Sequence, residues 1–119
     1  MIESTYRTLA AWQRAVEFAI AIYEVTKRFP VHERFGLTQQ LRRAAVSVPS
    51  NIAEGRDRGS RRDYRHFLLQ ARGSLFELET ELDIAECLLY CDGAAALDLR
   101  KLVSATIRPL TGLINSLDD

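Results

Sequence analysis

The sequence predicts an all-α protein, a left-handed up-down-up-down four-helix bundle that forms a single domain over residues 1–119. Apolar residues recur three and four positions apart along most of the chain, whereas the strict alternation typical of strands is weak. Short stretches with glycine or proline interrupt this pattern and divide the chain into four long helical segments. Because short connections between long helices favour antiparallel neighbours, these segments predict a bundle.

The first predicted helix runs from about Thr8 to Phe29 and ends before Pro30. It carries two apolar stripes: Leu9, Trp12, Val16, Ala19 and Tyr23 on one side, and Ala11, Ala15, Phe18, Ile22, Val25 and Phe29 on the other. A helix that is apolar over so much of its circumference is buried on more than one side. In so small a domain we expect the second side to meet another subunit.

The second predicted helix spans Leu37–Arg56, with Thr38 as the candidate cap of its first turn. Pro49 lies in its middle, although apolar and small residues keep helical spacing across it. Proline removes a backbone donor and clashes with the carbonyl four residues earlier, which costs about 3 kcal/mol in a straight helix. We therefore expect a kink at Pro49.

The third predicted helix begins after Ser60, a candidate N-cap, and ends near Tyr90. Its apolar positions alternate four and three apart, a heptad seam typical of left-handed bundle packing: Tyr64, Leu68, Ala71, Leu75, Leu78, Leu82, Ala85 and Leu89. Three acidic residues are expected off this seam, toward solvent or a partner: Glu77, Glu81 and Asp83.

Gly93 is the candidate C-terminal residue of the third helix. The fourth predicted helix then covers about Ala94 to Leu117, and Pro109 is expected to bend it. Its inward positions are predicted to be Leu99, Leu102, Val103, Leu110, Leu113 and Leu117.

The formal net charge is zero, but charges of opposite sign are segregated along the chain. Residues 28–72 carry ten basic and four acidic side chains, a balance of +6, and residues 73–119 carry three and nine, a balance of −6. The basic segment therefore meets either nucleic acid or the acidic segment of its own or a neighbouring chain. Charge alone favours the second interpretation, since nucleic-acid-binding domains usually carry an overall positive balance.

Metal, membrane and secretion signals are weak in this sequence. Cys87 and Cys91 are four residues apart, without the further paired ligands of a structural zinc site, so we expect reduced thiols, no metal and no cofactor. No apolar run approaches the roughly 20 residues of a membrane-spanning helix. The N-terminal residues lack the layout of a signal peptide, which predicts a cytoplasmic protein without membrane contact.

One polar group is a candidate for chemistry. Antiparallel pairing of the second and third helices could bring together Asn51, Glu54, Arg72, Ser74 and Glu77. The functional interpretation is a polar pocket, in which Glu54 and Glu77 are the best acid–base candidates. The structural interpretation, which is favoured, is close helix packing at small residues, with Asn51 and Glu54 satisfying backbone groups near the kink. We therefore predict no catalytic residues and no enzyme activity.

The densest basic cluster joins the second helix to the third and comprises Arg56, Arg58, Arg61, Arg62 and Arg65. Arginine forms bidentate contacts with phosphate, and a helix N-terminus favours anions. One interpretation is a nucleic-acid-binding tip of the bundle. The other is a solvated tip, or a network of ion pairs between subunits.

Several segments together resemble one known family, the 23S ribosomal RNA intervening-sequence proteins. The matching segments are Ala11–Gln13, Tyr23–Pro30, Glu33–Ala44, Ser47–Gly55 (Ser-Val-Pro-Ser-Asn-Ile-Ala-Glu-Gly) and Ala71–Thr80. The resemblance covers about Leu9 to Tyr90 and is highly specific, whereas the last helix matches only in pattern.

The resemblance implies a bacterial four-helix bundle that assembles as a ring-shaped homopentamer with a central channel. The family takes its name from genes within inserts in ribosomal RNA genes. A related branch, the accessory variability determinant of diversity-generating retroelements, is strongly basic, pentameric, binds nucleic acid and engages a reverse transcriptase.

Three functions follow as hypotheses. The first is a non-enzymatic homo-oligomer, pentameric by resemblance, that binds RNA or DNA or scaffolds a nucleoprotein complex, with a reverse transcriptase as the implied kind of partner. The second is a protein-interaction ring without nucleic acid. The least favoured is a small-molecule enzyme that uses the neighbourhood of Asn51, Glu54 and Glu77.

Overall fold

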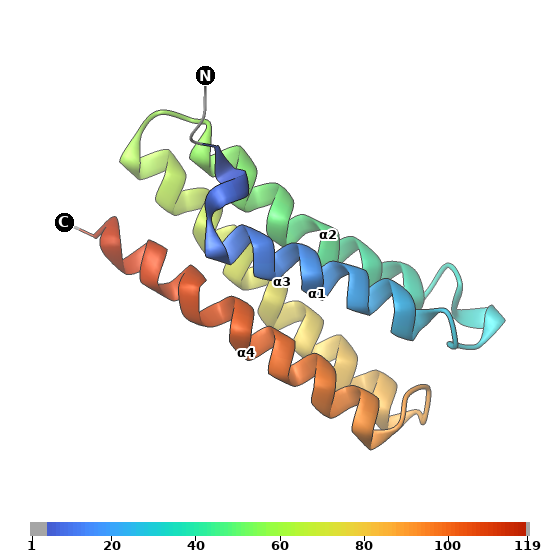
Figure 1. The fold of residues 1–119 in the computed structure, drawn as a ribbon. Helices are drawn as coiled ribbons and strands as arrows, with labels where there is room; N and C mark the ends of the chain where they lie inside the picture. The colour runs from blue at the N-terminus through green and yellow to red at the C-terminus, as the bar shows by residue number, and fades with distance from the viewer. Residues whose placement is uncertain (1–4, 119) are drawn as a thin grey trace.

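The computed structural model describes residues 5–118, and within this range the chain forms helices and no strand. The long helices pack side by side in an elongated bundle (Figure 1), and the principal extents of the molecule are 44 × 25 × 20 Å. The long helices are α1 (Ala10–Thr26), α2 (Leu37–Arg56), α3 (Arg61–Cys87) and α4 (Gly93–Ser116); the short 3-10 helices η1 (Tyr6–Thr8) and η2 (Val31–Glu33) precede α1 and α2. The prediction of an all-α bundle of four helices is confirmed.

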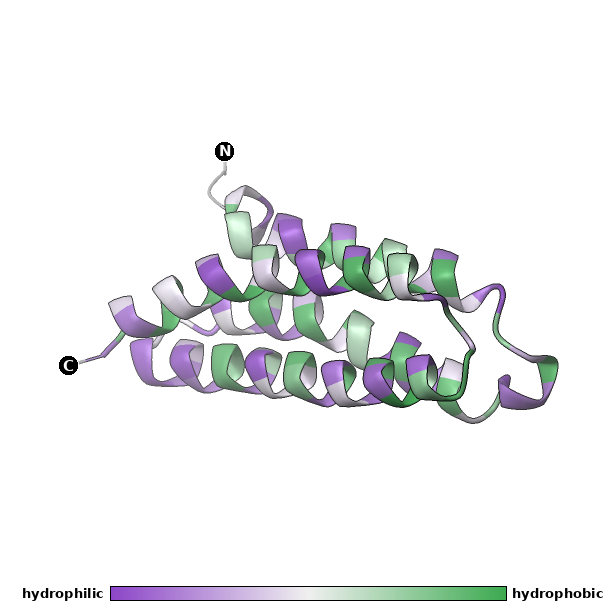
Figure 2. Cartoon of the chain, turned by 90° about the horizontal axis from the view of Figure 1, so that it is seen from below, coloured by the Kyte–Doolittle hydropathy of each residue, from purple (hydrophilic) through white to green (hydrophobic). Residues whose placement is uncertain are grey.

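All four long helices contribute to one apolar core. The largest fully buried side chains are Phe18 and Ile22 of α1, Leu41, Val48 and Ile52 of α2, Leu68, Leu75, Leu78 and Leu82 of α3, and Leu99, Leu110 and Ile114 of α4. Hydrophobic and hydrophilic positions alternate along every helix in Figure 2, as expected for helices with one buried face. None of the helices within residues 5–118 is long and apolar enough to cross a membrane.

Helix α1 is shorter than predicted, and of its two apolar stripes one is buried except at Val25, which is only partly buried. Ala11, Ala15, Phe18 and Ile22 are at most 1 % exposed. The other stripe is only partly covered, and Tyr23 within it is 42 % exposed. The second side that the sequence predicts to be covered is therefore half open in the isolated chain.

Helix α2 has the predicted bounds, but its cap is not Thr38. Thr38 lies inside the first turn and is buried. The N-cap residue of α2 is Gly36, which has no side chain to cap the helix. Instead, the carboxylate of Glu33 accepts a hydrogen bond from the backbone N–H of Leu37 at 3.0 Å. A side chain of the preceding linker thus replaces the local cap, because the turn at η2 brings Glu33 over the open end of the helix.

Helix α2 continues through Pro49 without interruption. Asn51 donates a side-chain hydrogen bond to the carbonyl oxygen of Ser47 at 2.8 Å, close to the point where proline removes a backbone donor. Pro109 likewise lies inside the continuous α4. The bends expected at the two prolines stay predictions.

Helix α3 starts as predicted, because the Ser60 side chain accepts a hydrogen bond from the backbone N–H of Asp63 at 3.1 Å. It ends earlier than predicted, at Cys87. The residue that turns the chain out of the helix is Leu89, with φ of 64°, and the N–H of Tyr90 donates to the carbonyl of Ala85 at 2.9 Å. This is the Schellman arrangement that glycine usually provides.

Two further expectations for the end of α3 were wrong. Gly93 does not close α3; it is the first residue of α4, where the Asp92 side chain accepts from the N–H of Ala95 at 2.8 Å. Leu89 does not belong to the buried seam and is 87 % exposed, because it lies in the turn beyond the helix. The seam is buried from Leu68 to Ala85.

Contacts between side chains show how the helices meet. The Ser47 hydroxyl lies 2.6 Å from that of Ser74, and Gly55 lies against Phe67, so α2 and α3 run antiparallel where they touch. The α4 residue Arg100 binds Asp83 at 2.6 Å and Glu86 at 2.7 Å, both on α3. The half-buried Arg100 is thereby fixed beside two carboxylates.

Candidate nucleic-acid interface

The five arginines of the predicted basic cluster lie at one end of the bundle, which we call the arginine tip: Arg56, Arg58, Arg61, Arg62 and Arg65. Figure 1 shows the α2–α3 turn at the same end as the last turns of α4. Gly59 allows the tight turn, since its φ of 86° is a conformation that other residues rarely adopt.

Most side chains of the arginine tip have intramolecular contacts. Arg58 binds Glu54 one helical turn earlier at 3.1 Å and lies over the ring of Phe67. Arg61 donates to the backbone carbonyl of Ser116 at 3.1 Å, and Arg65 binds the carboxylate of Asp118 at 2.8 Å. The last two contacts fasten the start of α3 to the end of α4.

A shallow hollow of about 470 Å³ opens between these two helix ends. It is lined by Arg61, Arg62, Arg65, His66, Leu69, Leu117 and Asp118. Arg62 forms no ion pair with any described residue, and among residues 5–118 Asp118 is the single carboxylate that lines the hollow. Among residues 5–118, three guanidinium groups and the N-terminal end of α3 outweigh one carboxylate at this hollow, an arrangement that favours anions.

The polar residues of α2 and α3 do not all converge. Ser47, which the sequence analysis did not include among the candidates, joins Ser74 at the contact between the helices. Glu54 is exposed and pairs with Arg58, whereas Asn51 bonds within its own helix. Arg72 is half-buried and forms no ion pair within residues 5–118.

The register of α2 against α3 separates the two acid–base candidates. Gly55 meets Phe67, so the neighbouring Glu54 lies at the level of Phe67. Glu77 lies ten residues further along α3, which corresponds to about 15 Å at 1.5 Å per residue. Glu54 and Glu77 therefore do not share one pocket in the isolated chain.

The structure buries one carboxyl group of α3 for which the sequence did not predict burial. Glu81 is only 6 % exposed, and its Oε1 atom has no hydrogen-bond partner. Burial, together with the neighbouring Glu77, raises the pKa of Glu81 to about 7. Glu81 is off the heptad seam, as predicted, but it does not face solvent. It follows Leu78 by three residues and precedes Ala85 by four, a spacing that places it beside the buried face.

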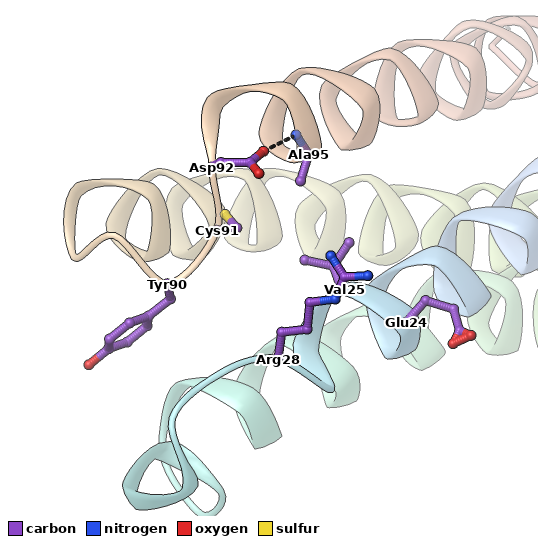
Figure 3. A pocket seen from close by; sticks show the side chains of 7 residues that line it. All are labelled: Glu24, Val25, Arg28, Tyr90, Cys91, Asp92 and Ala95. Carbon is purple, nitrogen blue, oxygen red and sulfur yellow. Dashed lines mark hydrogen bonds between the residues drawn. The ribbon is translucent and has the colours of Figure 1, made fainter.

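The opposite end of the bundle holds a smaller pocket of about 250 Å³, shown in Figure 3. Its lining comes from the end of α1, the α3–α4 loop and the start of α4: Glu24, Val25, Arg28, Tyr90, Cys91, Asp92 and Ala95. Burial raises the pKa of the half-buried Cys91 thiol, and both cysteines are free. This thiol is therefore protonated and is not an activated nucleophile.

Tyr90 connects this end to the α1–α2 linker. Its hydroxyl donates to Glu33 Oε2 at 2.8 Å, and its ring contacts that of Phe29. Hydrogen bonds from the Leu37 N–H and from Tyr90 lower the pKa of Glu33. Within residues 5–118, no group of three or more histidine, cysteine, aspartate or glutamate side chains lies close enough together to hold a metal ion.

Comparison with known proteins gives one family. The sequence model of the 23S rRNA-intervening sequence protein family matches residues 7–112, which include all of α1, α2 and α3 and most of α4. Comparison with curated protein sequences gave no match. The match covers nearly the whole chain and agrees with the four-helix fold, and we conclude that this protein belongs to the family of 23S rRNA-intervening sequence proteins.

Proposed function

We propose that this protein is a non-enzymatic, self-associating bundle that binds the phosphates of nucleic acid through its arginine tip. The observation that supports nucleic-acid binding best is the hollow that brings Arg61, Arg62 and Arg65 together at one end of the bundle. Phosphate contacts supply most of the affinity of sequence-independent nucleic-acid binding, and arginine is well suited to them.

The existing contacts of the tip do not oppose this role. In the ion pair between Arg65 and Asp118 the guanidinium is half-buried and the carboxylate is exposed to solvent, so a phosphate can reach the pair and replace the carboxylate. Arg62 is available without any exchange of partners among the described residues. The zero net charge of the chain predicts weak binding that disappears as salt is added.

Self-association is supported by apolar surface that the isolated chain leaves open. A hollow of about 460 Å³ on the outer face of α1 and α2 is lined almost entirely by apolar groups, including Val16, Ile20 and Val46. Ile20 is 60 % exposed, and on α3 Phe76 is 52 % exposed. Two different apolar faces suit a head-to-tail contact, which closes into a ring when the rotation permits.

We propose that this ring is the pentamer implied by the family resemblance. Sedimentation velocity at micromolar concentration should show one discrete species of about five chains. A monomer at that concentration would contradict the assembly. The left-handed up-down-up-down course and the bends at Pro49 and Pro109 belong to the same proposal. A crystal structure of the assembly would measure the helix-axis angles across each proline.

The test of nucleic-acid binding is a titration of labelled RNA and DNA at about 50 and about 200 mM salt. The double variant Arg61→Ala/Arg62→Ala should bind more weakly. Loss of two phosphate contacts should also reduce the slope of log affinity against log salt by about two. A matched control is Lys101→Ala/Arg108→Ala, which removes the same charge from exposed positions on α4. Equal binding by the two variants, or no binding at low salt, would remove the tip as a phosphate site.

A protein-interaction ring without nucleic acid is the second candidate. The apolar hollow on α1 and α2 favours it, since such a surface recognises protein rather than phosphate. Retained assembly together with absent RNA and DNA binding at low salt would establish this alternative. A nucleic-acid-processing protein, such as a reverse transcriptase, is the kind of partner that the family resemblance implies for either function.

A further inference from the structure

A second basic surface lies far from the arginine tip, where the α1–α2 linker crosses the ends of α1 and α2 (Figure 1). We call it the α1–α2 basic surface and define it by Tyr23, Arg34, Phe35, Gln39, Arg42 and Arg43. These residues line a hollow of about 370 Å³, and an adjoining hollow of about 290 Å³ shares Arg34 and Arg42 with it. Within residues 5–118, no carboxylate lines either hollow.

Arg42 is held in place by buried groups. Its Nε donates to the hydroxyl of Thr26 at 2.8 Å, and its NH2 donates to the carbonyl of Tyr23 at 3.3 Å. Thr26 is only 3 % exposed and donates in turn to the Ile22 carbonyl at 2.7 Å. The guanidinium also lies 4.7 Å from the centre of the Tyr23 ring. Arg42 is therefore a preorganised cation rather than a mobile surface arginine.

The surface also exposes aromatic rings to solvent. Phe35 is 81 % exposed, with the guanidinium of Arg34 at 5.2 Å from its ring centre. Tyr23 is 42 % exposed. Large apolar side chains that stay exposed beside cations are unfavourable for a solvated surface and favourable for a stacking contact.

The nearby carboxylates are engaged elsewhere. Both oxygens of Glu33 accept hydrogen bonds on the other side of the linker, from the Leu37 N–H and the Tyr90 hydroxyl. Glu24 pairs with Lys27 at 2.8 Å. Arg43 forms no ion pair within residues 5–118. Unlike the arginine tip, this surface offers three guanidinium groups without a competing carboxylate in the hollow.

We propose that the α1–α2 basic surface binds single-stranded nucleic acid, with phosphates on Arg34, Arg42 and Arg43 and one base stacked on Phe35. Exposed rings interleaved with cations are the combination that single strands require, since every base has a flat face to stack. An acidic protein segment would use the cations but not the flat face of Phe35. The inference shares its ligand class with the proposed function but rests on separate residues.

The test compares two labelled probes of equal length and charge, a single-stranded oligothymidylate and an abasic phosphodiester strand. Wild-type protein should bind the oligothymidylate about fivefold or more tightly, the lower range for one stacked base. Phe35→Leu, which removes the flat ring, should abolish this preference, whereas Leu97→Ala, at an exposed apolar position on α4, should keep it. Arg34→Ala/Arg43→Ala should weaken binding of both probes relative to Lys101→Ala/Arg108→Ala. All the substituted residues are exposed.

The affinities of the variants distinguish between binding at this surface and binding at the arginine tip. Normal affinity of Arg34→Ala/Arg43→Ala, with loss in Arg61→Ala/Arg62→Ala, would overturn this surface and leave the proposed function intact. The reverse pattern would support this surface and remove the arginine tip. No binding of either probe at low salt overturns both. Equal affinity of the wild type for the two probes, stronger competition by a polyglutamate peptide, or dissociation of the assembly by Phe35→Leu would also overturn the inference.

Discussion

Glu81 introduces a titratable group into the interior of the bundle. Its carboxyl is buried beside Glu77, and one of its oxygens has no hydrogen-bond partner. Burial of a charge without a partner is costly, so the neutral form is favoured and the pKa rises to about 7. At neutral pH this one side chain is therefore divided between its two protonation states.

The free energy of unfolding should therefore fall as pH rises. The unfolded chain ionises Glu81 near its ordinary pKa of 4.5, whereas the folded chain holds the proton until about pH 7. The contribution of Glu81 to the free energy of unfolding should be fully present below pH 4.5. It should decline between pH 4.5 and about pH 7 and then level off, with a total loss of about 1–3 kcal/mol.

Glu81→Gln is the direct test, since it keeps the shape of the side chain and removes the titration. Urea unfolding at several pH values should show a flatter profile for this variant and higher stability than wild type at pH 8. Asp98→Asn, at an exposed position on α4, serves as the control. A wild-type-like pH profile in Glu81→Gln would refute the role of this carboxyl group.

Leu89 is the residue whose backbone is least favourable. It adopts a φ of 64° while its side chain is 87 % exposed, so strain is not offset by burial. Leu89→Gly should stabilise the fold by about 1 kcal/mol, since glycine adopts this conformation freely. Leu88→Gly, one residue earlier and at negative φ, should instead destabilise. Thermal unfolding of both variants tests these two predictions. A melting temperature of Leu89→Gly below that of the wild type would contradict the first.

At the scale of elements, the contact between α2 and α3 depends on the small size of Gly55. A Cβ atom there would lie 2.8 Å from the Cβ of Phe67 and 3.2 Å from the carbonyl oxygen of Tyr64. Gly73 has nothing within 4 Å of the same position. Two helical glycines that look alike in the sequence are therefore under different constraints.

Alanine at these two glycines should have opposite effects. Gly55→Ala should destabilise by about 1–3 kcal/mol, because it forces α2 and α3 apart. Gly73→Ala should stabilise by about 0.5–1 kcal/mol, because it lowers the entropy of the unfolded chain without a clash. Denaturant midpoints of the two variants measure both changes. Equal shifts of the same sign would show that the close approach at Gly55 does not limit the packing.

On the scale of the whole molecule, the surfaces proposed for nucleic-acid binding and for assembly differ in position. The arginine tip and the α1–α2 basic surface lie toward opposite ends, whereas the apolar hollow of α1 and α2 lies on the side of the bundle and adjoins the basic surface at Tyr23, which lines both. A ring formed through the sides of the bundle would leave its ends accessible. The arginine tip shares no lining residue with the apolar hollow, so nucleic-acid binding at the tip and assembly should be separable by mutation.

Ile20→Glu and Val46→Glu should each dissociate the assembly without unfolding the chain. Both side chains are exposed in the isolated bundle, so glutamate is tolerated there, whereas an apolar contact between subunits would have to bury its charge. Sedimentation velocity and circular dichroism together measure the two effects. Leu97→Glu, at a similarly exposed position on α4, is the control, and intact assembly in both test variants would place the subunit contact elsewhere.

The sequence by itself determined the helical elements. The bounds of α2, the cap at Ser60 and the buried seam from Leu68 to Ala85 follow from residue spacing and turn chemistry, which act within one element. For the same reason the arginine tip could be predicted, since its residues are close together in the chain. The family was also recognisable from its local segments, and residues 7–112 match it.

Tertiary structure alone decided the features that join different elements. Glu33 caps α2 while it binds Tyr90, 57 residues later in the chain. The α1–α2 basic surface forms only because α1 brings Tyr23 and Thr26 beside Arg42. Periodicity reports which residues share a face, but the register between helices depends on how side chains interlock across the contact. That register keeps Glu54 apart from Glu77 and admits Gly55 against Phe67.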